Sequence, residues 1–458
     1  MQNISKRKSF GRIGVRSAPN GYFAAFFILS FVAAFLLHYE YYGAAIGVFA
    51  VAWVVIPALA LTDKIVFDGV RLRRTGLLPS LWMKIGGGRD RLRLAHIEQV
   101  ETHAIRSLKR GGRVHYRYRT AFRGRGSAMV AVSGGAGFRR LVTEVLRRLP
   151  DEVMDTRSME LRDFAAEPAE VAKRADESKI PHAEVLEASM KELRRRSRRR
   201  APAANAVAEQ EERAEHLRQL ANELRISGSL TRALEAFRRA AILSPNNGWL
   251  LFEFARCLQS VAGAERDGKL ERRALAMMRL AERRAGDDGE LLARLGENYF
   301  QAGDWSRADI VYNRCVDRIG ETFLAMRGLA EIALRQGKIA HVILNFSAAN
   351  RSTSTGSLKR WTQGEVEYFS KLNSDEEYME LEVSRVNLAD SLTRSRRTAV
   401  RIGLFGMPLI LAGILFDENL VANIGWAISM VSVAFWIAIS LLRQTVERRI
   451  PVGLVDSE

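Results

Sequence analysis

The sequence of 458 residues predicts a multidomain membrane protein that combines an α-helical repeat array, a small β-rich domain and four transmembrane helices. Three observations predict this fold class. Small and aromatic residues recur every 34 residues within 209–356. Four apolar runs, each about long enough to cross a bilayer, lie in two pairs near the ends of the chain. Between the first pair and the array, segments rich in β-branched and aromatic residues alternate with glycine-rich breaks.

The repeat array is recognised by its spacing. Five positions return after 34 residues, so that Gly296, Gly303, Ala308, Tyr312 and Cys315 are followed by Ala330, Gly337, Val342, Phe346 and Ala349. A fixed period of about 34 residues is that of the tetratricopeptide repeat (TPR), and this stretch resembles that family. The resemblance implies four helix pairs over 209–356, stacked into a solenoid with a concave groove. In the second pair the period slips by seven residues, which predicts an insertion in the turn at 263–269.

The register of the repeats predicts which side chains face the groove. These are Arg218, Asn222, Arg225, Trp249, Phe252, Arg256, Gln259, Glu297, Phe300, Arg327, Glu331 and Arg335. Arg218 and Asn222 match two members of the family's carboxylate clamp for peptide C-termini, but Glu253 stands where the clamp requires a second Asn. Five Arg and three aromatic residues favour a protein partner that presents an acidic or amphipathic peptide. The alternative is that these Arg residues form a solvated face.

Two transmembrane hairpins are predicted, one over 21–61 and the other over 398–442. A cleaved signal peptide is disfavoured for the first apolar run because a second run follows at once. The short loops inside the hairpins lack Lys and Arg, whereas the outer flanks are rich in both. The positive-inside rule therefore predicts a multi-pass protein of the inner (cytoplasmic) membrane, with both termini and the central domains in the cytoplasm. Gly43 and Gly47, and Gly403, Gly406 and Gly413, permit close contacts between helices.

Residues 62–150 are predicted to form the β-rich domain. We expect strands at 65–72, 91–107, 113–123 and 127–133, followed by a helix over 138–149 that stops at Pro150. The segments 70–78 and 94–100, after a membrane hairpin, are similar to the bacterial pleckstrin-homology-like (PH-like) family. That resemblance implies several strands closed by one C-terminal helix.

This domain is also strongly basic. It holds 20 Lys and Arg against six Asp and Glu, a net charge of +14 out of +18 for the whole chain. We expect contact with anionic lipid through Arg71, Arg73, Arg74, Arg194, Arg195, Arg196, Arg198, Arg199 and Arg200. Charge that merely sets the topology explains the pattern equally well. Binding of nucleic acid through the Arg and Tyr residues of 113–119 is disfavoured because the strand adjoins the membrane.

The remaining segments are predicted as a basic cytoplasmic N-terminus at 1–20, a charged helical linker with an Arg cluster at 151–208, capping and connecting helices at 357–397, and a cytoplasmic tail at 443–458. The two cysteines, Cys257 and Cys315, are expected to be packed thiols, and no cofactor, metal or catalytic set is recognised. The glycine-rich stretch 133–137 before a helix is a weak phosphate seat, and catalysis is disfavoured.

The sequence thus predicts a scaffold or adaptor, anchored in the membrane, that presents a TPR groove to a partner protein associated with the membrane. The alternative is a structural subunit of a transport, secretion or envelope-synthesis complex, or a homo-oligomer, assembled through the transmembrane helices.

Overall fold

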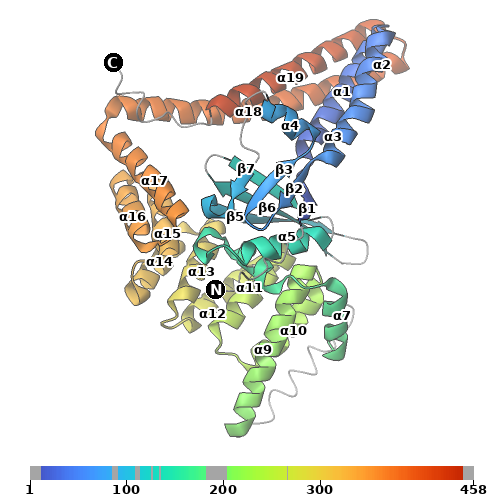
Figure 1. Cartoon of the computed structure of the whole chain (residues 1–458). Helices are drawn as coiled ribbons and strands as arrows, with labels where there is room; N and C mark the ends of the chain where they lie inside the picture. The colour runs from blue at the N-terminus through green and yellow to red at the C-terminus, as the bar shows by residue number, and fades with distance from the viewer. Residues whose placement is uncertain are drawn as a thin grey trace, which may run out of the picture. The chain divides into compact units, whose positions relative to one another are not determined.

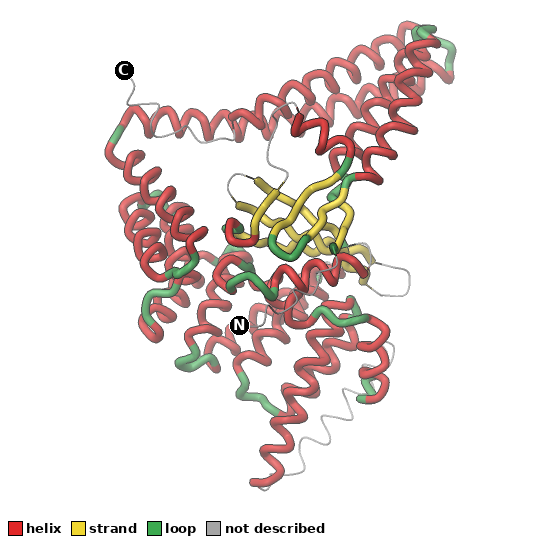
Figure 2. Tube along the Cα trace, in the orientation of Figure 1, coloured by secondary structure: helices red, strands yellow, loops and turns green. Residues whose placement is uncertain are grey.

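The structure is a computed structural model that describes residues 12–84, 91–108, 114–124, 127–133, 136–181, 204–265 and 267–446. The chain is mostly helical (Figure 2). It divides into two units, which are described separately. The first comprises Met1–Ala18 and Asp63–Gln363, and the second comprises Pro19–Thr62 and Gly364–Glu458.

The first unit contains two antiparallel sheets. The four-stranded sheet has the order β1 (Ile13–Arg16), β2 (Lys64–Phe67), β3 (Arg71–Thr75) and β4 (Arg91–Arg93). The three-stranded sheet has the order β5 (Gln99–Leu108), β6 (Val114–Gly124) and β7 (Ser127–Val132), and α5 (Ala136–Leu146) follows it (Figure 1). Alternation places Ile65, Phe67, Leu72 and Leu92 inside, together with Leu141 of α5, so the two sheets and α5 share one apolar core.

Three short elements of this region differ from expectation. The strand β1 lies in the basic segment expected to be a plain tail, and Arg16 pairs with Lys64, so the first hairpin is inserted between two neighbouring strands. The strand expected at 65–72 is broken by a turn, in which Asp68 Oδ1 accepts hydrogen bonds from the backbone N–H groups of Val70 and Arg71. The helix α4 (Leu77–Lys84) was not expected. All three are too short to show a period in the sequence.

Four helix pairs follow in the first unit. They are α9 (Ala204–Ser227) with α10 (Leu230–Leu243), α11 (Gly248–Glu265) with α12 (Gly268–Arg284), α13 (Gly289–Gln301) with α14 (Trp305–Ile319), and α15 (Phe323–Arg335) with α16 (Ile339–Ser352). The 34-residue period reflects close packing. The Tyr312 ring is 2% exposed and lies directly against Gly296 and Gly328, where a Cβ atom would collide with it. Gly303 adopts φ +83° in the turn between α13 and α14, a conformation that favours glycine.

The seven-residue insertion lengthens helices rather than a loop. The helices α11 and α12 contain 18 and 17 residues, whereas α13 and α14 contain 13 and 15. The Asp267 side chain caps α12 by accepting a hydrogen bond from the Lys269 N–H at 2.7 Å. In this pair the array therefore departs from regularity through its helices, whereas the sequence predicts a longer turn.

The first described part of the expected linker is packed into the unit. It contains α6 (Thr156–Phe164) and α7 (Pro168–Glu177). Val153, Met154 and Leu161 belong to the core that also contains the sheets and the later helix pairs, and Val171 packs with α9 and α10. The Arg cluster at 194–200 lies outside the described residues. After α16, α17 (Gly356–Ser374) places the Trp361 ring edge-on to Phe346 at 5.6 Å between centroids.

The second unit holds the apolar helices. The described residues contain four helices that are long and apolar enough to cross a membrane: Gly21–His38, Tyr42–Thr62, Glu376–Leu415 and Asn419–Arg443. The first lies in α1 (Asn20–His38), and the second combines α2 (Tyr42–Ala50), a π-helical turn (Val51–Val55) and α3 (Ile56–Thr62). Pro57 lacks the N–H that would bond to Trp53, which accounts for the π-helical turn just before it. The third and fourth lie in α18 (Glu376–Leu415) and α19 (Asn419–Val446).

Glycines explain how closely α18 and α19 pack. A Cβ atom at Gly406 or Gly413 would collide with the facing residues Ser429 or Ala422 of α19. The Ser429 hydroxyl donates a hydrogen bond to the Gly403 carbonyl at 3.0 Å. The three glycines of α18 thus make the close contact expected of them. The two hairpins also touch each other, since His38 Nε2 lies 3.0 Å from Asn423 Oδ1.

Candidate interaction site

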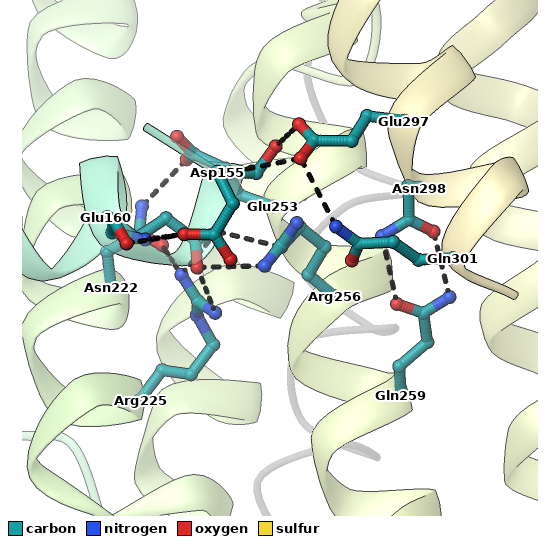
Figure 3. A network of polar contacts seen from close by, with 12 residues as sticks. Asp155, Glu160, Asn222, Arg225, Glu253, Arg256, Gln259, Glu297, Asn298 and Gln301 are labelled. Atoms are coloured by element: carbon teal, nitrogen blue, oxygen red, sulfur yellow. Dashed lines mark hydrogen bonds and ion pairs between the residues drawn. The ribbon is translucent and has the colours of Figure 1, made fainter. Parts of the chain in front are cut away.

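The predicted groove residues lie on α9, α11, α13 and α15, and the chain's own segment 151–164 packs against the first three of these helices. Figure 3 shows Asp155 and Glu160 of this segment among side chains of α9, α11 and α13. Glu160 of α6 binds Arg225 on α9 and Arg256 on α11, at 2.9 and 2.8 Å. Thr156, at the start of α6, donates hydrogen bonds to Glu297 on α13 from its N–H and its hydroxyl. At the other end of the segment, Glu152 accepts a hydrogen bond from the Thr355 hydroxyl at 3.1 Å. The segment therefore occupies much of the expected groove.

Glu160, Arg225 and Arg256 form a buried charge cluster. Glu160 is 7% exposed and the two Arg residues are 5% exposed. Burial raises the pKa of the Glu160 carboxyl, but the two guanidinium groups outweigh that effect and hold its pKa below its ordinary value. Burial also lowers the pKa of Arg256, and Arg225 and Arg157 act in the same direction. Two guanidinium groups share one carboxylate, so the cluster keeps an excess of positive charge.

The clamp-like pair at the start of the array is satisfied within the chain. The Glu253 carboxylate accepts hydrogen bonds from Arg218 at 2.8 Å and from the Asn222 side chain at 2.7 Å. Glu253 is the residue that departs from the clamp pattern, and its carboxylate engages both of the side chains that match that pattern. This pair consequently offers no vacant place for a peptide C-terminus.

Cavities remain on both sides of the segment. The largest has a volume of about 680 Å³ and is lined by the groove residues Arg225, Arg256 and Gln259. Two smaller ones, of about 360 and 390 Å³, are lined by the groove residues Arg218, Trp249, Phe252, Glu297, Phe300, Arg327 and Glu331. Within the described part of the chain, Arg256 Nη1 has no hydrogen-bond partner. Ten of the twelve predicted groove residues thus line a cavity, and Asn222 and Arg335 do not.

A cluster of two aromatic rings and one Arg lies in the last two helix pairs: Phe300 on α13, Trp305 on α14 and Arg335 on α15. The Arg335 guanidinium is 4.4 Å from the Phe300 ring centroid and 5.5 Å from that of Trp305. Trp305 is 47% exposed and the neighbouring Leu334 is 41% exposed. The register predicted Phe300 and Arg335 but missed Trp305, because Trp305 opens the second helix of its pair. An exposed Trp beside exposed Arg could have signalled this surface, since both are enriched at binding hot spots.

Asp155 is an acid near the groove whose pKa is raised. It caps α6 and accepts hydrogen bonds from the Ser158 N–H at 2.9 Å and the Thr102 N–H at 3.3 Å. Burial raises the pKa of Asp155 to about 7, and the nearby Glu297 carboxylate adds to that rise. The hydrogen bonds oppose the rise without cancelling it. Asp155 therefore titrates near neutral pH.

The residues expected to contact lipid separate into three groups. Arg71 and Arg73 point outward and are exposed. Arg74 points the other way, and its Nε donates to Asp63 Oδ1 at 2.9 Å, where Asp63 is 1% exposed. Strand alternation explains the difference between Arg73 and Arg74. The members of the 194–200 cluster lie outside the described residues.

The other positions considered for chemistry are held in structural contacts. Both cysteines are fully buried, and burial raises the pKa of Cys257 to about 12. The Ser133 hydroxyl accepts a hydrogen bond from the Tyr118 N–H at 2.8 Å, while Gly134 and Gly135 fall outside the described residues. Across the described ranges, no group of three His, Cys, Asp or Glu residues could hold a metal ion.

Comparison with known proteins adds little to this picture. No protein-family model matches the sequence, and no curated protein matches it. Among solved structures, the chain is similar to the crystal structure of the APC/C hetero-tetramer Cut9-Hcn1, with 14% identity and a TM-score of 0.29. The match covers 68% of this chain and 52% of that chain, so this chain spans about half the length of that protein. A likeness at this score carries no conclusion about function.

Proposed function

We propose that this chain is a scaffold, anchored in the inner membrane, whose helix pairs hold a partner protein at the cytoplasmic face. The four apolar helices support the anchoring, and the four consecutive helix pairs support the binding role, because stacked pairs present extended surfaces. In this proposal the pairs are TPR-like repeats. The two sheets followed by α5 form a PH-like domain, a resemblance that the strand order and the closing helix support.

The cluster formed by Trp305 and Arg335, which are exposed, and Phe300, which is half-buried against the core, is the observation that carries this proposal. Most other groove residues are engaged with the chain's own carboxylates or lie beneath the 151–164 segment. At this cluster, by contrast, a large aromatic surface faces outward next to a guanidinium group. Trp and Arg together provide apolar area, planar stacking and hydrogen bonds to a partner. We therefore place the main partner contact here.

Crosslinking in intact membranes tests this assignment. A photoreactive amino acid is placed at Leu334, beside the cluster, or at Ile310, which is 63% exposed on the same helix as Trp305. We expect a discrete crosslinked product from position 334 and little from position 310. The combined Trp305→Ala and Arg335→Glu substitutions should reduce that product about tenfold or more, the loss expected for a hot spot.

The substituted positions are exposed, so the folded protein should persist at normal levels in the membrane. Equal products from positions 334 and 310 would indicate random collisions, and an undiminished product in the double variant would refute the assignment. Identification of the crosslinked protein by mass spectrometry then defines the partner, which we expect to be associated with the membrane.

A contact between the basic sheet and anionic lipid is the second part of the proposal. Arg71 and Arg73 support it because both lie on the outward face of the sheet, although the Arg71 Nε also donates to Asp68 Oδ2 at 2.7 Å. Arg74 is directed to the buried Asp63 instead. The 194–200 cluster is included on its composition alone. Nucleic acid remains a disfavoured partner, because the segment considered for it, 113–119, belongs to the small β-rich domain that follows the apolar hairpin.

The alternative function, a structural subunit assembled through transmembrane helices, is favoured by one observation. Gly43 and Gly47 of α2 have nothing within 4 Å of the place a Cβ atom would take, unlike the packed glycines of α18. Their spacing permits close approach of another helix. Native mass spectrometry of the Gly43→Leu/Gly47→Leu variant should then show a dissociated complex. Phe49→Leu changes an exposed position of α2 that lies neither three nor four residues from either glycine, so it is the control, and equal complexes in both variants would rule this alternative out.

A further inference from the structure

One end of the four-stranded sheet is tied to the first hairpin by very short connections. Arg16, the last residue of β1, pairs with Lys64, the first residue of β2, and the Ser17 N–H donates to the Asp63 carbonyl at 3.2 Å. The apolar span begins at Gly21 and the following one ends at Thr62. The chain itself therefore holds this end of the sheet within a few residues of two spans.

The register of β3 brings α4 to the same end. The strand β3 is antiparallel to β2, and its last residue, Thr75, lies opposite Lys64. Gly76 follows, and α4 begins at Leu77. Leu77 and Leu78 are 57% and 41% exposed, although they are large apolar residues. The other end of β3 carries the turn around Val70, roughly 13 Å away at about 3.3 Å per residue.

The outward face of this sheet is basic on all four strands. Its exposed positions are Arg16, Lys64, Arg71, Arg73, Arg91 and Arg93. Arg73 stands directly opposite Arg91, and Arg71 stands opposite Arg93. The Arg71 guanidinium also binds Asp68 at 2.7 Å, so the face carries an excess of basic over acidic groups rather than basic groups alone. Such a face attracts an anionic surface, and that attraction would be lost at high salt.

We propose that α4 lies in the headgroup region of the same membrane, with Leu77 and Leu78 inserted and the basic sheet face against anionic phospholipids. This proposal rests on the membrane anchoring proposed above and adds a second point of contact. Exposed leucines beside basic residues have the chemistry of an interfacial anchor. The occupant is a lipid surface rather than a protein because the short connections to the spans keep both features near the bilayer. The covalent link to the spans and the contact through α4 would together fix the orientation of the sheet relative to the membrane. The link alone would leave that orientation free.

Depth-dependent quenching tests the proposal on the full chain. Single cysteines are introduced by Leu78→Cys or Val70→Cys and labelled with an environment-sensitive fluorophore. Because both native cysteines are fully buried, the wild-type chain serves as the labelling blank. The protein is reconstituted in nanodiscs of phosphatidylcholine, with or without phosphatidylglycerol, that contain lipids spin-labelled on the acyl chain. Val70 is 68% exposed, against 41% for Leu78, so position 70 is a control at an exposed apolar residue near the other end of β3.

We expect quenching at position 78 to exceed quenching at position 70 by about twofold or more, with a blue-shifted emission only at position 78. Phosphatidylglycerol should increase the quenching at position 78, and the combined Arg73→Gln and Arg91→Gln substitutions should remove that increase. Equal quenching at both positions in anionic nanodiscs would overturn the proposal. Quenching that is insensitive to phosphatidylglycerol would overturn the role of the basic face.

Two further outcomes separate this inference from the proposed function. If the chain is released from native membranes by alkaline carbonate, the membrane anchoring itself fails. If the chain stays in the membrane but position 78 remains exposed to water, only the contact through α4 fails. A crosslink from position 78 to a second copy or to another protein would indicate a protein occupant and would also contradict the inference.

Discussion

Arginine residues at the two ends of the helix array have opposite environments: Arg225 and Arg256 in the first two pairs are buried, and Arg335 in the last pair is exposed. On α9 and α11, Arg225 and Arg256 are 5% exposed and bind the Glu160 carboxylate of the chain's own α6. On α15, Arg335 is exposed and stacks on Phe300 and Trp305. All three Arg residues occupy groove positions of the same repeat register. Register thus identifies the helix face, while the segment packed over that face decides between an internal and an external role.

The comparison also shows where substitutions can inform on function. A charge change at Arg256 would leave Glu160 buried without full compensation, so loss of partner binding in that variant would report misfolding. A change at Arg335 removes contacts at the surface. The experiments that follow compare these two ends, from the largest expected effect on stability to the smallest.

The first prediction concerns Glu160. The Glu160→Ala substitution leaves Arg225 and Arg256 buried without their carboxylate, which should destabilise the fold by about 3–5 kcal/mol. The measurement is denaturant unfolding of the full chain in detergent, followed by a signal from the cytoplasmic domains. Replacement of all three charges by Glu160→Leu, Arg225→Met and Arg256→Met should cost less than Glu160→Ala alone, because no unpaired charge remains. A larger loss in the triple variant would show that the charge cluster itself stabilises the fold.

These contacts indicate what could be predicted from the sequence. The helix array could be predicted from the sequence because small residues and an aromatic residue (Tyr312, then Phe346) recur with the period that packing between helix pairs requires. The segment 151–164 could not be predicted to occupy the groove. Glu160 is one acid in a charged segment, and its partners Arg225 and Arg256 lie 65 and 96 residues away. The strand β1 and the helix α4 were missed for a related reason. Their four and eight residues carry no period, and β1 is defined by pairing with a strand beyond the first hairpin.

The second prediction concerns Asp155, which lies between the two ends of the groove beside Glu297 of α13. Burial raises the pKa of Asp155 to about 7 from an ordinary 3.8, so the folded state keeps a proton that the unfolded state loses. Its contribution to stability is therefore fully present below about pH 4 and is lost as the pH rises to about 7. The cavity beside it also holds charged or titratable groups on β5, on the 151–164 segment and on the later helix pairs: Glu101, His103, Glu152, Arg157, Glu297, Arg327 and Glu331.

Asp155→Asn isolates this effect, because Asn caps a helix about as well as Asp but cannot ionise. The melting temperature of the variant should depend less on pH than that of the wild type. Above about pH 7 the variant should be the more stable of the two, by at most about 4 kcal/mol at 1.36 kcal/mol per pKa unit. Asp163→Asn is the control, because Asp163 is an exposed acid of α6 whose ion pair with Arg162 is open to solvent. Asp63→Asn is unsuitable because Asp63 is buried and paired with Arg74. A parallel pH dependence in the wild type and in Asp155→Asn would contradict the raised pKa of Asp155.

The smallest effect on stability is expected at the exposed end. Arg335→Ala removes two stacking contacts and one hydrogen bond to the Glu331 carbonyl, at a position where water replaces them. The loss should be below about 1 kcal/mol, as for other exposed interactions of cations with aromatic rings. Unfolding of this variant under the conditions used for Glu160→Ala measures the difference directly. Arg335→Lys, which keeps the charge but loses the planar stacking, should unfold like Arg335→Ala and should also reduce the crosslinked product from position 334. A destabilisation of Arg335→Ala as large as that of Glu160→Ala would mean that the exposed cluster is part of the fold, and the partner contact would then have to be sought elsewhere on the helix pairs.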